Sequence, residues 1–392
     1  MNRNKNGFAH ILLILTIVGI ILAVGTFGIM GYQKQNNTPQ QKNQRAVNAF
    51  AAKYTNCPKT DAVFSYLPLA EENFDSWIPL GKVADGHVIP ADHVYLSAKQ
   101  QAGDGYNVPV VMPSDGRIVQ VNNLPAQYVG DKNVTKSTTK DYNITIAHSC
   151  RYFSIFIHLH RLSDVIVNKV GNVSPGATKK VSIDMQAGDV IGYVGSAPFD
   201  WSLIDTQTTL SGFINPGNYV NQPQLLHIVD PISIYTGVLR NVLIAKDRKK
   251  AEPYGGRVDW DQPGKLIGNW FRVGTNGVQK GGNRYWDNQL AIVPDAIDND
   301  LKIYSTGNWN GVARQFVMQG NPDIANITPA DGVKKIQLLQ VSNGPSGGST
   351  DQPAGVVLLQ VLDNEKLRVE QFLNATLEQV QGFTAAAKTY ER

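Results

Sequence analysis

Short runs of β-favouring residues, each ended by Gly, Pro, Asn or Asp, recur along most of this 392-residue chain and constrain its fold more than any other feature. Between residues 63 and 244 they include VPVVM, GRIVQV, NITIAHS, YFSIFIHL and DVIGYVG. After residue 264 they include QLAIVP, LKIYSTG, RQFVMQ and KKIQLLQV. Runs of this length and spacing are typical of antiparallel β domains. The sequence therefore predicts a mainly β protein.

Chain length and one break in this pattern predict two β domains. A chain of 392 residues exceeds one ordinary domain. The segment AKDRKKAEPYGGRVDWDQPG at 245–264 interrupts the β runs. We expect a β domain at 63–245, a linker at 246–264 and a C-terminal β domain of unknown role at 265–392. Within the second domain, Asp363 and Asn364 between two β runs predict a hairpin.

Residues 8–31 form an apolar stretch without Asp, Glu, Lys or Arg. As a helix it would reach about 36 Å, which is enough to cross a bilayer. Arg3 and Lys5 precede it, so the positive-inside rule places the N-terminus in the cytoplasm. We therefore expect a single-pass cell-membrane protein with a cytoplasmic stub (1–7), a transmembrane helix (8–31) and a tether with a short helix (32–62). The bulk of the chain would then be extracytoplasmic.

Charge and cysteine content exclude two kinds of site. The net charge is +4 from 36 basic and 32 acidic residues, and no long basic run with interleaved aromatic residues occurs, so nucleic acid is not an expected partner. Cys57 and Cys150 are the only cysteines. In an oxidising compartment they could form one disulfide, which the sequence leaves open. The lack of a Cys-x-x-Cys spacing excludes a cysteine zinc site.

Four segments of the first β domain carry a family resemblance. They are MPSDGRIVQV (112–121), YNITIAHSCRYFSIFIHLHRLSDVI (142–166), SIDMQAGDVIGYVGSA (182–197) and PQLLHIVDP (223–231). In this order they resemble the lysostaphin/LytM-type zinc endopeptidases of bacterial cell walls, over roughly residues 86 to 235. The resemblance implies a LytM-like antiparallel β-sandwich. It also implies zinc as the cofactor, and peptidoglycan or a cell-envelope protein as the partner.

The same resemblance implies a site that has lost part of its chemistry. His93 matches the first metal ligand, His227 matches the metal histidine of the His-x-His motif, and His158 matches a catalytic histidine. Ser97 stands where the family has its metal-binding Asp, and Leu225 replaces the second catalytic His. Serine is a poor zinc ligand and leucine can neither orient water nor move protons. Substitutes for the lost groups could come from these nearby residues: His87, Asp92, His160 and Asp230.

Three functions remain open on the sequence. The favoured one is a degenerate peptidase domain that binds peptidoglycan or a partner protein without hydrolysis. The alternative is an active zinc endopeptidase that cleaves cell-wall crosslinks with His93, His227 and a third, unidentified ligand. A third possibility takes DGRIVQV and AGDVIGYVG as only the β pattern of biotinyl- and lipoyl-type modules. Convergence of His93, His158 and His227 would distinguish the first two from the third.

Overall fold

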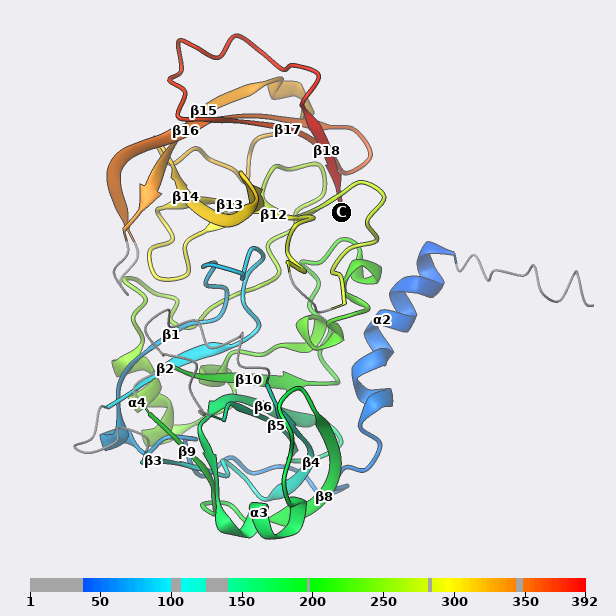
Figure 1. Ribbon diagram of the computed structural model, residues 1–392, viewed down its shortest axis with the longest axis vertical. Helices are drawn as coiled ribbons and strands as arrows, with labels where there is room; N and C mark the ends of the chain where they lie inside the picture. The colour runs from blue at the N-terminus through cyan, green and yellow to red at the C-terminus, as the bar shows by residue number, and fades with distance from the viewer. Residues whose placement is uncertain (1–37, 100–106, 125–139, 196–197, 281–283, 343–347) are drawn as a thin grey trace, which may run out of the picture. The chain divides into compact units, whose positions relative to one another are not determined.

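A computed structural model describes residues 38–99, 107–124, 140–195, 198–280, 284–342 and 348–392. The chain divides into two compact units, residues 1–42 and 43–392, of which the second holds all of the described strands. Within the described residues there are eighteen strands and only short helices, so the prediction of a mainly β protein is confirmed (Figure 1). The predicted domain boundaries stay predictions.

The predicted localisation, a single-pass membrane protein, is wrong. Among the helices of the described residues, none has both the length and the apolar character that crossing a bilayer requires. Residues 8–31, from which the transmembrane helix was predicted, lie outside the described residues.

Helix α2 (Pro39–Lys53) lies within residues 32–62, for which the sequence predicts a tether with a short helix. A capping box formed by Thr38 and Gln41 explains why the helix begins here. The Thr38 backbone N–H donates to Gln41 Oε1 at 2.9 Å, and the Gln41 backbone N–H donates to Thr38 Oγ1 at 3.3 Å. Further along the helix, Phe50 is buried and meets Phe153 edge to face, with ring centroids 5.3 Å apart.

The first part of the larger unit contains two antiparallel sheets. The seven-stranded sheet has the order β1-β2-β10-β6-β5-β4-β8, and the three-stranded sheet has the order β3-β9-β7. Buried side chains of both sheets share one hydrophobic core. The elements of this part are β1 (Phe74–Ile78), β2 (Val94–Ala98), β3 (Val108–Val111), β4 (Gly116–Asn123), β5 (Tyr142–Ala147), β6 (Tyr152–Leu159), β7 (Arg161–Leu162), α3 (Asp164–Val170), β8 (Thr178–Met185), β9 (Val190–Val194), β10 (Phe199–Asp205), η4 (Pro223–His227) and α4 (Gly237–Lys246).

The remaining strands close into an antiparallel barrel, in which β18 pairs with β11. The predicted hairpin is confirmed, since Leu362 and Lys366 are paired on either side of its turn. At the closure, the buried Arg392 guanidinium lies 4.0 Å from the centroid of the Trp270 ring and donates to the carbonyl oxygen of Ile267. The strands are β11 (Gly268–Arg272), β12 (Gln289–Pro294), β13 (Lys302–Trp309), β14 (Val312–Met318), β15 (Lys334–Val341), β16 (Ser349–Leu362), β17 (Lys366–Leu373) and β18 (Lys388–Glu391).

The disulfide that the sequence left open is present between Cys57 and Cys150. It ties the segment that follows α2 to the turn between β5 and β6. A second consequence of the topology matters for function. Three neighbouring strands with alternating directions bring the start of β10, the end of β6 and the start of β5 to one end of the large sheet. The start of β2 lies beside them because Val94 pairs with Trp201, close to the start of β10.

Candidate functional site

Histidine and aspartate side chains gather at this end of the large sheet, near the strand termini. The register explains why: Trp201 pairs with Val94, Asp200 pairs with Ile157, and Tyr142 pairs with Leu159. Residues just before β2 and β5, at the start of β10 and at the end of β6 are thereby brought together, although they are far apart in sequence. We call these residues the His–Asp cluster: His87, Asp92, His93, Asp141, His158 and Asp200.

His158 is held by carboxylates on both ring nitrogens. Its Nδ1 lies 3.0 Å from Asp141 Oδ2, and its Nε2 lies 3.2 Å from Asp200 Oδ2. Burial alone would lower the pKa of His158, but the hydrogen bonds and charges of the two aspartates outweigh burial and raise it to about 10. The backbone of His158 has φ +70°, which is uncommon for a residue other than glycine. His158 is therefore an imidazolium fixed in a strained position.

His93 has a similar arrangement with different partners. Its Nδ1 lies 2.9 Å from Asp92 Oδ1, and its Nε2 lies 3.4 Å from Asp200 Oδ2. Burial lowers the pKa of His93, but the charge of Asp200 and the hydrogen bond to Asp92 give a net raised pKa. Asp92 is fixed in turn by Gln224, whose Nε2 donates to Asp92 Oδ2 at 3.0 Å. Asp92 and His93 can touch because both lie in a bend before β2, where the strand alternation does not yet apply.

His87 completes the cluster as a neutral ring. Its centroid is 4.9 Å from that of His93, and the two rings meet edge to face. Burial, and then the charge of His93, lowers the pKa of His87 to about 4. The cluster thus combines one neutral imidazole with two imidazoles whose protonated forms are stabilised by carboxylates.

We expect the protein to lose stability as the pH rises above neutrality. The pKa of His158 is raised from 6.5 to about 10 in the folded state, so its contribution is complete below pH 6.5 and disappears as the pH approaches 10. Between pH 7 and pH 9 the free energy of unfolding should fall by about 2 kcal/mol. Urea denaturation across this range measures the change. His158→Gln should flatten the profile, and a wild-type profile that is already flat would contradict the charged state.

The other residues implied by the family resemblance are not part of the cluster's ion pairs. His227 Nδ1 lies 2.5 Å from the Thr208 carbonyl oxygen, and its Nε2 lies 2.7 Å from that of Val47, so both nitrogens face backbone acceptors. Ser97 pairs with Ser76 on β1. The carboxylate of Asp230 accepts from the backbone N–H groups of Ile232 and Gly256.

His160 does not share a strand face with His158. Strand β6 ends at Leu159, and the positive φ of His158 breaks the alternation before His160 is reached. The backbone N–H of His160 donates to the Tyr193 carbonyl oxygen at 3.0 Å. The structure therefore brings His87, His93 and His158 together, leaves His160 close enough to interact electrostatically with Asp141 and His158, and places His227 between backbone carbonyl groups.

The zinc that the resemblance implies does not fit this arrangement. No group of three or more His, Cys, Asp or Glu side chains within the described residues is suited to hold a metal ion. The chemistry agrees, because a histidine ligand must offer a lone pair, whereas carboxylates on both nitrogens of His158 favour a proton on each. His227 is likewise surrounded by acceptors on both sides.

Sequence reasoning missed Asp200, the residue that contacts both His93 and His158. A signal was present. In the family order, His-x-His follows a Gly-x-x-Gly-Ser motif, and the first strand after GYVGS in this chain is β10, where Asp200 and Ser202 have the same two-residue spacing. In the sequence, the His-x-His motif aligns instead with Leu225 and His227, because that segment contains a histidine at the second position of the motif.

A cavity of about 220 Å³ adjoins the cluster. His87, Asp92 and His93 line it, together with Leu225 from η4 and Ser202 from β10. Two residues of the barrel part, Tyr285 and Gln289, line it as well. The cavity therefore lies where the large sheet and the barrel part meet, within the larger compact unit.

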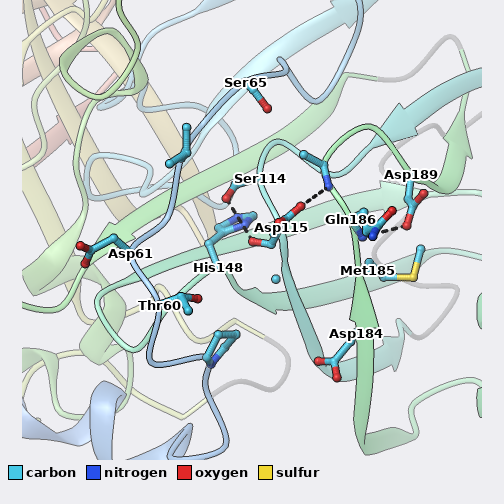
Figure 2. A pocket seen from close by; sticks show the side chains of 14 residues that line it. Thr60, Asp61, Ser65, Ser114, Asp115, His148, Asp184, Met185, Gln186 and Asp189 are labelled. Carbon is cyan, nitrogen blue, oxygen red and sulfur yellow. Dashed lines mark hydrogen bonds between the residues drawn. The ribbon is translucent and has the colours of Figure 1, made fainter.

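A larger hollow of about 730 Å³ lies at a different place, beside the disulfide-bonded segment, and shares none of the cluster's residues. Figure 2 shows His148 between Ser114 and Asp115 there, with further acidic side chains around it. His148 Nε2 lies 2.9 Å from Ser154 Oγ, and burial lowers its pKa to about 4. This histidine has the contacts of a structural residue.

Comparisons with known proteins give a remote likeness. No protein-family model matches the chain, and no curated protein matches it. A solved candidate peptidase of the twenty-third metallopeptidase family from Pseudomonas aeruginosa is 17% identical with TM-score 0.20, covering 43% of this chain. This chain spans 57% of that protein's length.

Two further similar structures are of lysostaphin. Its solution structure is 11% identical with TM-score 0.20, covering 77% of this chain and 80% of that one. The structure of the antimicrobial peptidase lysostaphin from Staphylococcus simulans is 12% identical with TM-score 0.26, covering 74% of this chain and 97% of that one. The chain is thus remotely similar to lysostaphin and to a candidate peptidase of the twenty-third family.

Proposed function

We propose that this protein binds peptidoglycan at the cavity beside the His–Asp cluster and does not hydrolyse it. The single observation that carries the proposal is the position of Asp200, whose carboxylate lies within 3.4 Å of Nε2 of His93 and within 3.2 Å of Nε2 of His158. The ligand class comes from the family resemblance of residues 86 to 235. The absence of hydrolysis comes from the chemistry of the cluster.

Amide hydrolysis needs a group that activates water. A metal ion can do this when it keeps an open coordination position, and a general base can do it when its pKa lies near the working pH. The pKa of about 10 leaves His158 protonated between its two carboxylates, and the carboxylates of Asp200 and Asp92 raise the pKa of His93. His87 is neutral, but with a pKa of about 4 it is a weak base. His158 is therefore too strongly protonated, and His87 too weakly basic, to serve as a general base near neutral pH.

The purified chain should contain far less than one zinc per molecule and should leave crosslinked murein intact. Metal content is measured by inductively coupled plasma mass spectrometry, and cleavage is measured by the turbidity of a sacculus suspension and by release of amino groups. Added zinc should change neither reading. Chelator-sensitive cleavage would establish the alternative, an active zinc endopeptidase, and would end this proposal.

Binding to sacculi should depend on the cavity. Gln222 lines it, and Gln222→Arg places a long cationic side chain there. Cosedimentation with sacculi should then fall by at least about tenfold, because a charge desolvated in a small cavity is costly. Gln352→Arg is the matched control, because Gln352 is exposed on β16. This variant should bind sacculi like the wild type. Equal binding by both variants would place any murein contact elsewhere on the chain.

A further inference from the structure

The barrel part supplies an unpaired hydrogen-bond donor to the cavity. Gln289 stands at the start of β12, is 1% exposed and lines the cavity. Within the described residues its Nε2 has no hydrogen-bond partner. A buried amide nitrogen without a partner is costly, and each such group in a folded protein calls for an explanation. A ligand that accepts a hydrogen bond there would satisfy it.

The large sheet supplies an acceptor to the same cavity. Asn143 on β5 lines it, and Asn143 Oδ1 is also buried without a hydrogen-bond partner in the described part of the chain. One donor and one acceptor in a single small cavity complement an amide group, whose carbonyl oxygen accepts and whose N–H donates. A carboxylate or an ammonium ion would satisfy only one of the two.

The charge and the volume of the cavity restrict the class of ligand further. Asp92 and His93 line the cavity, but the charge of His93 is balanced by Asp92 at its Nδ1 and by Asp200 3.4 Å from its Nε2. No described lining residue is Lys, Arg or Glu. A neutral ligand is therefore favoured. The volume, about 220 Å³, is below that of drug-sized sites and suits a small group. Apolar side chains next to the polar ones suit a short alkyl group: Ile89, Pro90, Ala91, Ile155, Ile157 and Leu225.

We propose that the barrel part determines selectivity at this cavity by binding a neutral secondary amide that carries a small alkyl group. Gln289 Nε2 donates to the carbonyl oxygen of the ligand, and the N–H of the ligand donates to Asn143 Oδ1. N-acylated sugars and short peptides share this chemistry. The inference rests on the proposed binding function. It adds to that function the chemical class of the ligand and the two residues, Gln289 and Asn143, that hydrogen-bond to the ligand.

The test uses the full chain with two small probes, N-acetylalaninamide and N-acetylglucosamine, titrated by ligand-observed NMR. At least one probe should bind, and the stronger one identifies the source of the amide. Gln289→Met should weaken binding about fivefold, because one hydrogen bond is lost. The same change should raise Tm by about 2 °C, because an unpaired buried donor is replaced by an apolar group.

Gln337→Met is the matched control. Gln337 is another buried barrel glutamine, but its Nε2 donates to the Gly355 carbonyl oxygen at 2.7 Å. This variant should lower Tm, because it leaves that carbonyl without a donor, and should bind the probes like the wild type. A higher Tm for Gln289→Met and a lower Tm for Gln337→Met would distinguish a glutamine without a hydrogen-bond partner from one whose hydrogen bond stabilises the fold.

Two results would overturn the inference. One is failure of both probes to bind the wild type. The other is unchanged probe binding by Gln289→Met, whatever the change in its Tm. Neither result touches the proposed function, which is judged separately on whole sacculi. Conversely, zinc-dependent cleavage of murein would end the proposed function even if Gln289→Met weakened probe binding.

Discussion

Replacing Asp200 with alanine is expected to lower the free energy of unfolding by about 3 to 5 kcal/mol, because it removes one partner from a buried set of charges. Asp200 is 5% exposed and lies against both His93 and His158. Without it, His158 keeps only Asp141 and His93 keeps only Asp92. Water cannot readily replace a carboxylate at this depth. Denaturation by urea at pH 6.5, followed by tryptophan fluorescence, measures the loss.

Asp184→Ala is the matched control for Asp200→Ala. The Asp184 carboxylate also pairs with a cation, since Arg117 Nε lies 2.6 Å from its Oδ1, but the Asp184 side chain is 72% exposed. Pairs in this setting contribute little, and the expected loss is below about 1 kcal/mol. Similar losses for the two variants would contradict the view that burial makes the cluster's pairs strong. A wild-type stability for Asp200→Ala would contradict a stabilising role for the Asp200 contacts with His93 and His158.

The strands could be predicted from the sequence because each one is a local pattern. YFSIFIHL became β6 and KKIQLLQV became β15, with the bounds that their composition indicates. Turn residues at Asp363 and Asn364 also act locally, and the hairpin that they predict is present. Closure of the last eight strands into a barrel is different. It depends on the pairing of β18 with β11, which no local pattern encodes.

The candidate site could be predicted only in part, because a motif identifies residues of expected types and gives no signal for a residue of another type. His93 and His158 were found since both are still histidines. Asp200 was missed because a single aspartate in an apolar run looks like any other polar residue until the sheet places β10 between β2 and β6. His227 was assigned to the metal on its residue type alone, whereas its two ring nitrogens face the carbonyl oxygens of Thr208 and Val47.

The contribution of Gln289 lay beyond sequence reasoning for another reason. The sequence predicts a separate C-terminal β domain, and nothing in it indicates that a residue of that part shares a cavity with His93. Only the three-dimensional contact between the large sheet and the barrel part reveals this.

Breaking the disulfide should cost about 4 kcal/mol of unfolding free energy, because it frees a long loop in the unfolded chain. Cys57 and Cys150 are 93 residues apart, and the loop between them contains β1 to β5. The double variant Cys57→Ala/Cys150→Ala should therefore unfold at lower urea concentration, and dithiothreitol should shift the wild type to the same midpoint. The double variant itself should not respond to dithiothreitol. If the wild type keeps its midpoint after full reduction, confirmed by thiol titration, the bond adds no stability and the β core alone holds this segment in place.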